Sequence, residues 1–210
     1  MAILYAFDDY KNKVAFDANI PVVVPMKLPD GSILFYDRGS SYGDYRLNDS
    51  GYPERIGDAV DDGSVSSPNW RYLICDQHDL DNGRKQWGAS NTSEGLSALV
   101  NRDVGAGLPN TNTMLAKYAT NTSYWWKLIK EKRDSTGLDW FMPSLDELNV
   151  VYNQRGIITS EGGDAFKTDD PYWSSSESGD SRAYGQSFSD GSESGNTKYA
   201  SNPCRVLRRI

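Results

Sequence analysis

The sequence is poor in the residues that build disulfide frameworks and histidine-based active sites. It contains two cysteines, Cys75 and Cys204, and one histidine, His78, among 210 residues. Two cysteines cannot make a disulfide framework, although a single bridge between them stays open. One histidine for the whole chain disfavours catalysis based on histidine. Basic residues are outnumbered, and the formal net charge of −7 would repel a phosphate backbone, so nucleic-acid binding is not expected.

Long hydrophobic runs are also missing. No stretch approaches the roughly 20 consecutive apolar residues that a membrane-spanning helix needs. The N-terminal residues MAILYAFDD lack the basic start, the long apolar run and the small-residue cleavage site of a signal peptide. We therefore expect no membrane insertion.

What remains is the composition of a folded globular protein, with 38% hydrophobic, 24% charged and 12% aromatic residues. No linker clearly divides the chain. We expect one domain over residues 28–210, preceded by an N-terminal segment, residues 1–27, that either packs on the domain or serves assembly.

The first third predicts strands with turns, and the middle third predicts helices. Apolar, β-rich runs occupy residues 21–25, 32–36 and 70–75, and Asp30-Gly31 is a turn dipeptide. Helical spacing of apolar residues follows over 96–100, 114–119, 124–129 and 145–152. We expect Asn91–Glu94 to cap the first of these helices. The sequence Ser144-Leu-Asp-Glu147 is a capping box for the last, and Gly156 stands where that helix should stop.

The final third is dominated by a segment of thirty residues, 174–203, of which ten are Ser and four are Gly. That composition is typical of a flexible tail, but the segment is bracketed by Tyr172-Trp173 and by an apparent terminal strand, 204–210. It also contains Phe188 and the turn dipeptide Asp190-Gly191. We therefore predict two or three short strands, with Trp173 and Phe188 buried among them.

The polar residues of this segment are those that dominate antibody combining sites. Tyr supplies a large contact area at low entropy cost, while Ser, Gly and Asn supply adaptable hydrogen bonds. Tyr184, Tyr199 and Arg182 lie among these small residues. The pattern favours a recognition surface.

Four motifs carry a resemblance to a known family: Trp140-Phe-Met-Pro-Ser-Leu-Asp-Glu-Leu148, Tyr172-Trp-Ser-Ser-Ser-Glu177, Phe188-Ser-Asp-Gly191 and Cys204-Arg-Val-Leu-Arg208. Together they resemble the C-terminal half of the variable proteins of diversity-generating retroelements. The resemblance implies an α+β, C-type-lectin-like domain in which helices pack on a twisted antiparallel sheet. It further implies a variable region at about 174–210, with its variable residues on the last strands and their loops.

In such proteins an error-prone reverse transcriptase randomises adenines, mostly in AAC codons. Codons randomised in their first two bases still end in C, so they cannot encode Lys, Glu, Gln, Met or Trp. In this segment those residue types occur at Glu177, Gln186, Glu193 and Lys198. None of these residue types occurs in the interrupted series of positions 178–182, 184, 185, 187, 189, 192, 194–197 and 199–203.

The resemblance implies non-catalytic recognition of a protein or glycan on a host or neighbouring cell surface, by a protein of a virion or a cell surface, with no cofactor. A homo-oligomer is left open. The implied ligand-binding residues are Ser178, Gly179, Asp180, Ser181, Arg182, Tyr184, Ser187, Ser189, Ser192, Ser194, Asn196, Thr197, Tyr199, Ser201 and Asn202.

Other activities of lectin-like folds remain as alternatives. Calcium-dependent sugar binding is disfavoured because the Glu-Pro-Asn, Gln-Pro-Asp and Trp-Asn-Asp signatures do not occur. The acidic loop 76–83 does not have the spacing of a calcium loop, so a hydrogen-bonded turn is expected there. Formylglycine-generating oxidases use two neighbouring cysteines, whereas Cys75 and Cys204 stand far apart and are expected to be buried thiols. A carboxylate pair of the glycosidase type stays open.

Overall fold

The computed structural model describes residues 21–210, which form three α-helices and nine strands in an α+β fold. All the strand pairs are antiparallel. A four-stranded sheet has the order β1-β2-β5-β9, where β1 is Met26–Lys27, β2 Ile33–Asp37, β5 Tyr72–Cys75 and β9 Leu207–Arg209. A hairpin pairs β3, Tyr45–Leu47, with β4, Pro53–Arg55. A three-stranded sheet contains β6, Tyr172–Gly179, β7, Arg182–Gln186, and β8, Glu193–Thr197.

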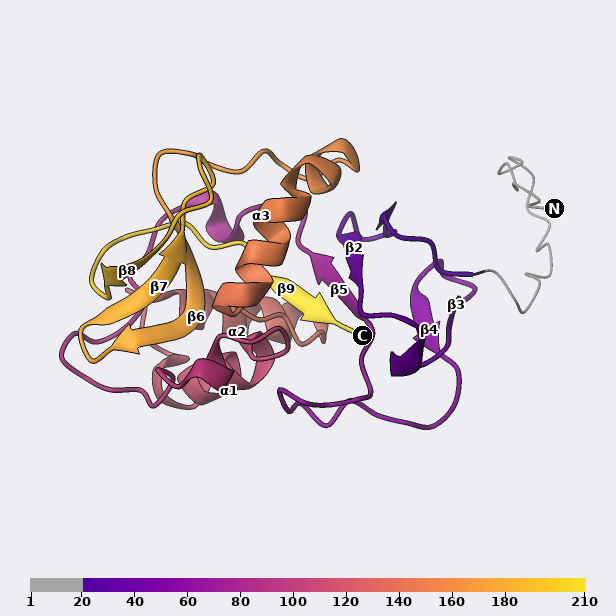
Figure 1. The fold of residues 1–210 in the computed structure, drawn as a ribbon, viewed down its shortest axis with the longest axis horizontal. Coiled ribbons are helices and arrows are strands. Elements are labelled where there is room, and N and C mark those ends of the chain that lie inside the picture. The colour runs from indigo at the N-terminus through magenta and orange to yellow at the C-terminus, as the bar shows by residue number, and fades with distance from the viewer. Residues whose placement is uncertain (1–20) are drawn as a thin grey trace.

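Helix α3, Leu145–Ser160, runs through the middle of the molecule (Figure 1). The β6-β7-β8 sheet lies at one end of the longest axis and the β3–β4 hairpin at the other. Helices α1, Gly107–Tyr118, and α2, Trp125–Thr136, lie on the side of the β6-β7-β8 sheet. The terminal strand β9 pairs with β5 in the four-stranded sheet. The three-stranded sheet is therefore formed by the part of the chain between α3 and β9.

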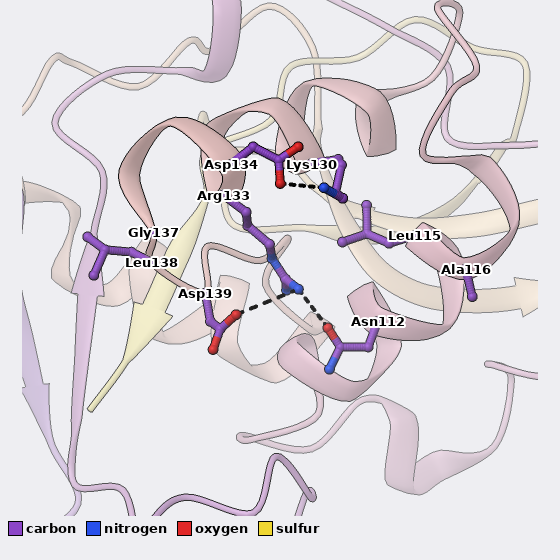
Figure 2. Close-up of a pocket in the computed structure, with 9 residues that line it drawn as sticks. All are labelled: Asn112, Leu115, Ala116, Lys130, Arg133, Asp134, Gly137, Leu138 and Asp139. Atoms are coloured by element: carbon purple, nitrogen blue, oxygen red, sulfur yellow. Dashed lines mark hydrogen bonds and ion pairs between the residues drawn. The ribbon is translucent and has the colours of Figure 1, made fainter.

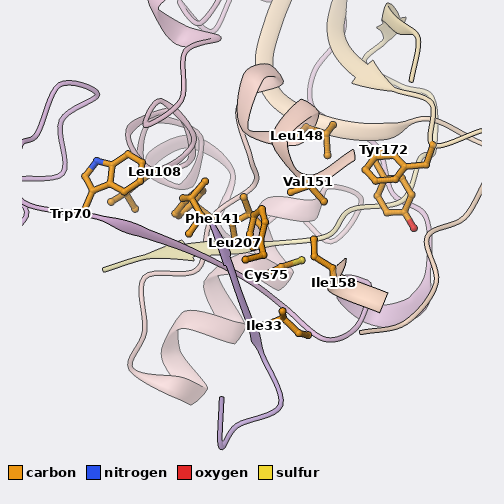
Figure 3. Close-up of a cluster of buried hydrophobic side chains, with 13 residues drawn as sticks. Ile33, Trp70, Cys75, Leu108, Phe141, Leu148, Val151, Ile158, Tyr172 and Leu207 are labelled. Carbon is orange, nitrogen blue, oxygen red and sulfur yellow. The ribbon is translucent and has the colours of Figure 1, made fainter. Parts of the chain in front are cut away.

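The main hydrophobic core fills the space between α3 and the four-stranded sheet (Figure 3). Leu148, Val151 and Ile158 of α3 are fully buried and pack with Ile33 and Leu207 of the sheet. These α3 residues recur at helical spacing, so one face of the helix covers the sheet. Tyr172 and Phe188 belong to the same cluster and connect it to the three-stranded sheet.

A second core is rich in tryptophan and lies between α2 and the three-stranded sheet. Trp87, Trp125 and Trp173 are fully buried in it. Their indole N–H groups donate to main-chain carbonyl oxygens of Ser174 at 2.7 Å, Asn202 at 2.9 Å and Lys85 at 3.1 Å, respectively. Because Ser174 and Asn202 lie at the two ends of the Ser-rich segment, these indoles fix its ends.

Several local predictions are confirmed. The run 32–36 overlaps β2, the run 70–75 contains β5, and the segment 174–203 supplies strands rather than a tail. The capping box forms: the Ser144 side chain accepts from the backbone N–H of Glu147, whose carboxylate accepts from that of Ser144. The turn at Asp190-Gly191 places Gly191 at φ +81, where a Cβ would lie 2.6 Å from the ring of Tyr152. Only glycine fits there.

Three local predictions are wrong. The run 21–25 makes only a single bridge from Pro21 to Arg46, because its prolines lack the N–H groups that a ladder needs. Helix α3 continues past Gly156 to Ser160. No helix starts at Asn91–Glu94, and a short 3-10 turn, Leu99–Asn101, follows before α1. There the backbone N–H groups of Glu94 and Leu96 bind the carboxylate of Glu177 instead of starting a helix.

The N-terminal segment predicted at residues 1–27 is described only from residue 21. Val22, Val24 and Met26 pack against a third small core that includes Leu28 and Tyr72. The described part of the segment therefore packs on the domain, and residues 1–20 lie outside the described residues. Cys75 and Cys204 are free and fully buried, so the alternative of a bridge between them is not realised.

Candidate recognition surface

The predicted ligand-binding residues lie on the β6-β7-β8 sheet and on the loops at its edges. Strand β7 pairs with β8 in a regular register, with Arg182 opposite Thr197 and Tyr184 opposite Gly195. Residues directly opposite in an antiparallel pair point to the same side, so Arg182, Tyr184 and Thr197 share one face. We call this face, with its adjoining turns and the 198–201 loop, the recognition surface.

Fourteen of the fifteen predicted residues are accessible. The exposed ones are Asp180, Arg182, Ser189, Ser192, Ser194, Tyr199 and Ser201, and the half-buried ones are Ser178, Gly179, Ser181, Tyr184, Ser187, Asn196 and Thr197. Asn202 is the exception at 5% exposed. It pairs through its backbone with Lys85, and its carbonyl accepts from Trp125, so it belongs to the scaffold.

The residues that randomised codons cannot encode lie mostly beneath this surface. Glu177 and Lys198 are both fully buried and form an ion pair. The Lys198 ammonium also donates to the carbonyl of Thr92 at 2.6 Å. Gln186 is fully buried too, and its amide donates to Asn149 at 2.9 Å and to the carbonyl of Gly191 at 3.1 Å. Glu193 departs from this pattern, since it is exposed.

A second buried carboxylate extends the network from the sheet to α1. The side chain of Glu94 is fully buried and accepts from Lys117 at 2.8 Å and from the hydroxyl of Tyr118 at 2.6 Å. Burial and the adjacent Glu94 carboxylate raise the pKa of Tyr118, so the phenol stays protonated as a donor. Buried charges of this kind are tolerated only when paired and hydrogen-bonded. These contacts fix loop 88–102 to α1, while the bonds of Glu177 to the backbone N–H groups of Glu94 and Leu96 fix it to β6.

Two aromatic side chains on the recognition surface differ in how they are supported. Tyr199 is 59% exposed on the loop that follows β8. Tyr184 is half-buried, and the guanidinium of Arg102 lies over its ring at 4.4 Å from the centroid. Tyr184 is thus held in one orientation, while Tyr199 projects into solvent.

Sequence reasoning did not find that loop 88–102 borders this surface. Ser181 donates to the side chain of Asn91 at 2.6 Å, and the backbone N–H of Thr92 donates to the carbonyl of Asp180 at 3.1 Å. The loop therefore borders the β6–β7 turn although about 90 residues separate them in sequence. No local spacing signals such a contact. Asn91 instead has a positive φ of 56, which is incompatible with the predicted helix start.

A separate hollow lies between α1 and α2 (Figure 2) and is not part of the recognition surface. Its polar floor is Arg133, whose guanidinium donates to Asn112 at 2.8 Å and to the carbonyl of Trp140 at 2.6 Å. The ion pair of Lys130 with Asp134 borders it (Figure 2). The residues that line it are Asn112, Leu115, Ala116, Lys130, Arg133, Asp134, Gly137, Leu138 and Asp139. None of them was predicted as a binding residue.

The two cysteines and Asp79 of the acidic loop are buried in the structure. Burial raises the pKa of the Cys75 thiol to about 12 and that of Cys204 well above its ordinary value, so neither is poised as a thiolate. In the acidic loop, Asp79 is 7% exposed and binds Arg205 at 2.7 Å and the hydroxyl of Tyr172 at 2.9 Å. Within residues 21–210, no group of three or more His, Cys, Asp or Glu side chains is placed to hold a metal ion.

The comparisons with known proteins give little to set beside this geometry. No protein-family model matches the chain, and no curated protein matches it. Among solved structures, the chain is similar to a fimbrial protein from Bacteroides ovatus ATCC 8483, with 16% identity and a TM-score of 0.49. The match covers 68% of this chain and 36% of the fimbrial protein, so the chain spans about a third of that protein's length. In the described part of the chain, no helix is long and apolar enough to cross a membrane.

Proposed function

We propose that the protein is a non-catalytic recognition protein whose recognition surface is diversified by a retroelement. In this proposal residues 178–201 bind a protein or glycan on a host or neighbouring cell. A few aromatic and arginine side chains, above all Tyr184, Tyr199 and Arg182, would supply most of the affinity, with small polar residues around them.

The observation that carries the proposal is that burial follows the coding pattern. Three of the four residues that randomised AAC codons cannot produce, Glu177, Gln186 and Lys198, are fully buried and make specific polar contacts. Between them, the residues that such codons can produce are accessible except for Ala183, Gly185 and Phe188. Variation would therefore fall on side chains that the fold does not need, while the buried polar framework stays constant.

The C-type-lectin-like fold is part of the same proposal. Three helices lie with antiparallel sheets, and the segment displays its residues on the last strands and their turns, as that fold implies. The four family-like motifs fall at structural positions: the capping box of α3, the first residues of β6, the turn after β7 and the approach to β9. We further propose that the protein is displayed on a surface, either a virion or a cell.

Sequencing the gene across its source population tests the diversification directly. We expect nucleotide variation concentrated in codons 178–203, at codons ending in C, with codons 177, 186, 193 and 198 constant. A near-copy template and a reverse transcriptase gene should lie nearby. A segment that is invariant, or that drifts at the rate of the rest of the gene, would overturn the retroelement origin.

Alanine substitutions test the recognition role. Tyr199→Ala, Arg182→Ala and Tyr184→Ala should each abolish ligand binding, measured by titration with the ligand that a host-surface screen identifies. Stability should change little for Tyr199 and Arg182, which are exposed. Tyr184→Ala should cost slightly more, about 0.5–1 kcal/mol, because it removes the ring beneath Arg102. Loss of the fold in these variants would make the residues structural and contradict the proposal.

A further inference from the structure

The 3-10 turn Leu99–Asn101 presents two aliphatic side chains to solvent beside the recognition surface. Leu99 is 74% exposed and Val100 50%. A single exposed aliphatic residue is ordinary, but two adjacent ones next to a candidate binding face are not explained by the fold. We call Leu99 and Val100 the aliphatic ridge.

Buried polar groups hold the ridge in place. The carbonyl of Asn101 accepts from the side chains of Asn110 and Ser176, each at 2.7 Å. Asn110 is 1% exposed and Ser176 fully buried, so these bonds are shielded from water. The side chain of Asn101 also donates to the carbonyl of Gly95 at 3.2 Å. An apolar contact fixed in this way loses little conformational entropy when a partner docks on it.

The ridge is continuous with the recognition surface through Arg102. Arg102 follows the turn directly, and its guanidinium lies over Tyr184. The Arg102 Nε atom is buried, and over residues 21–210 this guanidinium has no hydrogen bond or ion pair with a carboxylate. The stack of Arg102 on Tyr184 therefore joins the ridge to β7.

Three exposed carboxylates lie near Arg102, so negative charges outnumber this one positive charge. Asp103, Asp146 and Glu193 all lie in electrostatic range of one another or of Arg102. Burial, and then Asp103, raise the pKa of Asp146, while burial, and then Asp146, raise that of Glu193. One arginine cannot neutralise three carboxylates. A cationic group on a partner would complement them.

We propose that the aliphatic ridge and the carboxylates of Asp103, Asp146 and Glu193 form a constant docking site for a protein segment that carries an aliphatic side chain flanked by Lys or Arg. This inference rests on the proposed function, because it names the partner of the same surface as a protein rather than a glycan. Residues 99–103 and Asp146 lie outside segment 174–203, and Glu193 lies inside it at a position whose residue randomised codons cannot encode. This contact would therefore persist whatever residues the variable positions carry.

Backbone amide shifts of the 15N-labelled protein provide the test, with short synthetic peptides as probes. One peptide carries Leu-Ile flanked by lysines, and two matched peptides carry glutamates or serines in place of the lysines. We expect the lysine peptide to shift the amides of residues 99–103 and 193, and to bind at least about threefold more tightly than the other two. The preference should weaken as salt is raised.

Matched variants separate the two components of the docking site. Leu99→Ser with Val100→Ser should remove binding of the lysine peptide, and Asp103→Asn with Glu193→Gln should remove the preference for lysine over serine. Val60→Ser, at a position that is 76% exposed between β4 and β5, is the control and should bind as the unmodified protein does.

Two results would overturn the inference: equal binding of the three peptides, or shifts confined to residues outside 99–103 and 193. Shifts at the same amides with a neutral oligosaccharide, and none with the lysine peptide, would assign the ridge to a glycan and overturn it as well. None of these results bears on variation in codons 178–203. An invariant segment would conversely remove the proposed function and leave the peptide result standing.

Discussion

At the scale of single residues, a pair of charged side chains occupies interior positions of the kind that hydrophobic side chains fill elsewhere in the fold. Lys198 and Glu177 are fully buried and paired, and Glu177 also accepts the backbone N–H groups of Glu94 and Leu96. Such a pair gives little net stabilisation relative to apolar residues, but removal of one partner leaves an uncompensated charge in the interior. The pair therefore acts as a constraint on which residues these positions accept.

Lys198→Met tests this constraint. The substitution keeps an unbranched apolar side chain but leaves the buried Glu177 carboxylate without its cationic partner. It should therefore lower the free energy of unfolding by about 3–5 kcal/mol. Lys127→Met is the matched control, because Lys127 forms an i,i+4 pair with Glu131 on the surface of α2, worth about 0.3–0.5 kcal/mol. Denaturant unfolding of both variants measures the difference. Equal losses would mean that the buried pair carries no special constraint.

Asp37 gives a residue-scale prediction about pH. Its carboxylate accepts two hydrogen bonds from Arg71, at 2.6 and 2.8 Å, and these lower its pKa from the ordinary value of 3.8. A carboxyl whose pKa is lower in the folded state stabilises the fold above its unfolded pKa, and this contribution is lost as pH falls through the folded pKa. The stability advantage over Asp37→Asn should therefore be constant from pH 5 to 7 and shrink below about 3.8.

Urea unfolding over this range measures that advantage. Arg71→Gln should show a loss at neutral pH that shrinks in acid, down to the part that its hydrogen bond to the carbonyl of Gly43 contributes. If the stability advantage over Asp37→Asn stayed constant down to the lowest pH at which the protein folds, the lowered pKa of Asp37 would be contradicted.

At the scale of elements, the three-stranded sheet is held by its aromatic residues rather than by its own sequence propensity. Trp173 is fully buried and donates to the carbonyl of Lys85. Phe188 is 3% exposed and stacks on Phe166 with ring centroids 4.5 Å apart. These rings stand at the start of β6 and in the turn after β7, so they fix where the small polar strands begin and turn.

Trp173→Ala and Phe188→Ala should each destabilise the protein by about 3–5 kcal/mol in denaturant unfolding. Tyr199→Ala is the matched aromatic control, since its ring is 59% exposed and should cost less than about 1 kcal/mol. If the Tyr199 variant lost as much stability as the other two, the division between scaffold and surface would be wrong.

The elements that sequence reasoning predicted are those specified locally. The capping box of Ser144 and Glu147, the apolar face of α3 and the turn at Asp30-Gly31 each depend on residues within a few positions of one another. The helix predicted after Asn91 failed because its backbone donors bind Glu177, more than 80 residues later. The candidate surface was predictable in its strand residues, whose composition is unusual. Its border at Leu99–Arg102 was not, because only the folded chain brings it there.

At the scale of the whole molecule, both cysteine thiols lie inside the protein, so the rate at which they react measures how often the protein unfolds. Cys75 and Cys204 are fully buried on separate cores, and burial raises the pKa of each. The folded protein should react with a maleimide only as fast as it unfolds, and two adducts should form at once in strong denaturant. Intact mass spectrometry measures the number of adducts over time in both conditions. A single adduct that forms rapidly on the folded protein would place one thiol at the surface.

The two ends of the Ser-rich segment meet in the fold. The backbone N–H of Trp173 donates to the carbonyl of Pro203 at 3.0 Å. The chain between them is therefore a closed loop, and the cost of closing it depends only weakly on its length. Loop-closure entropy grows only logarithmically, by about 0.6 kcal/mol per doubling of length. Natural or engineered versions of this protein could thus differ in the number of residues they carry here, and not only in their identity, while keeping the same interior.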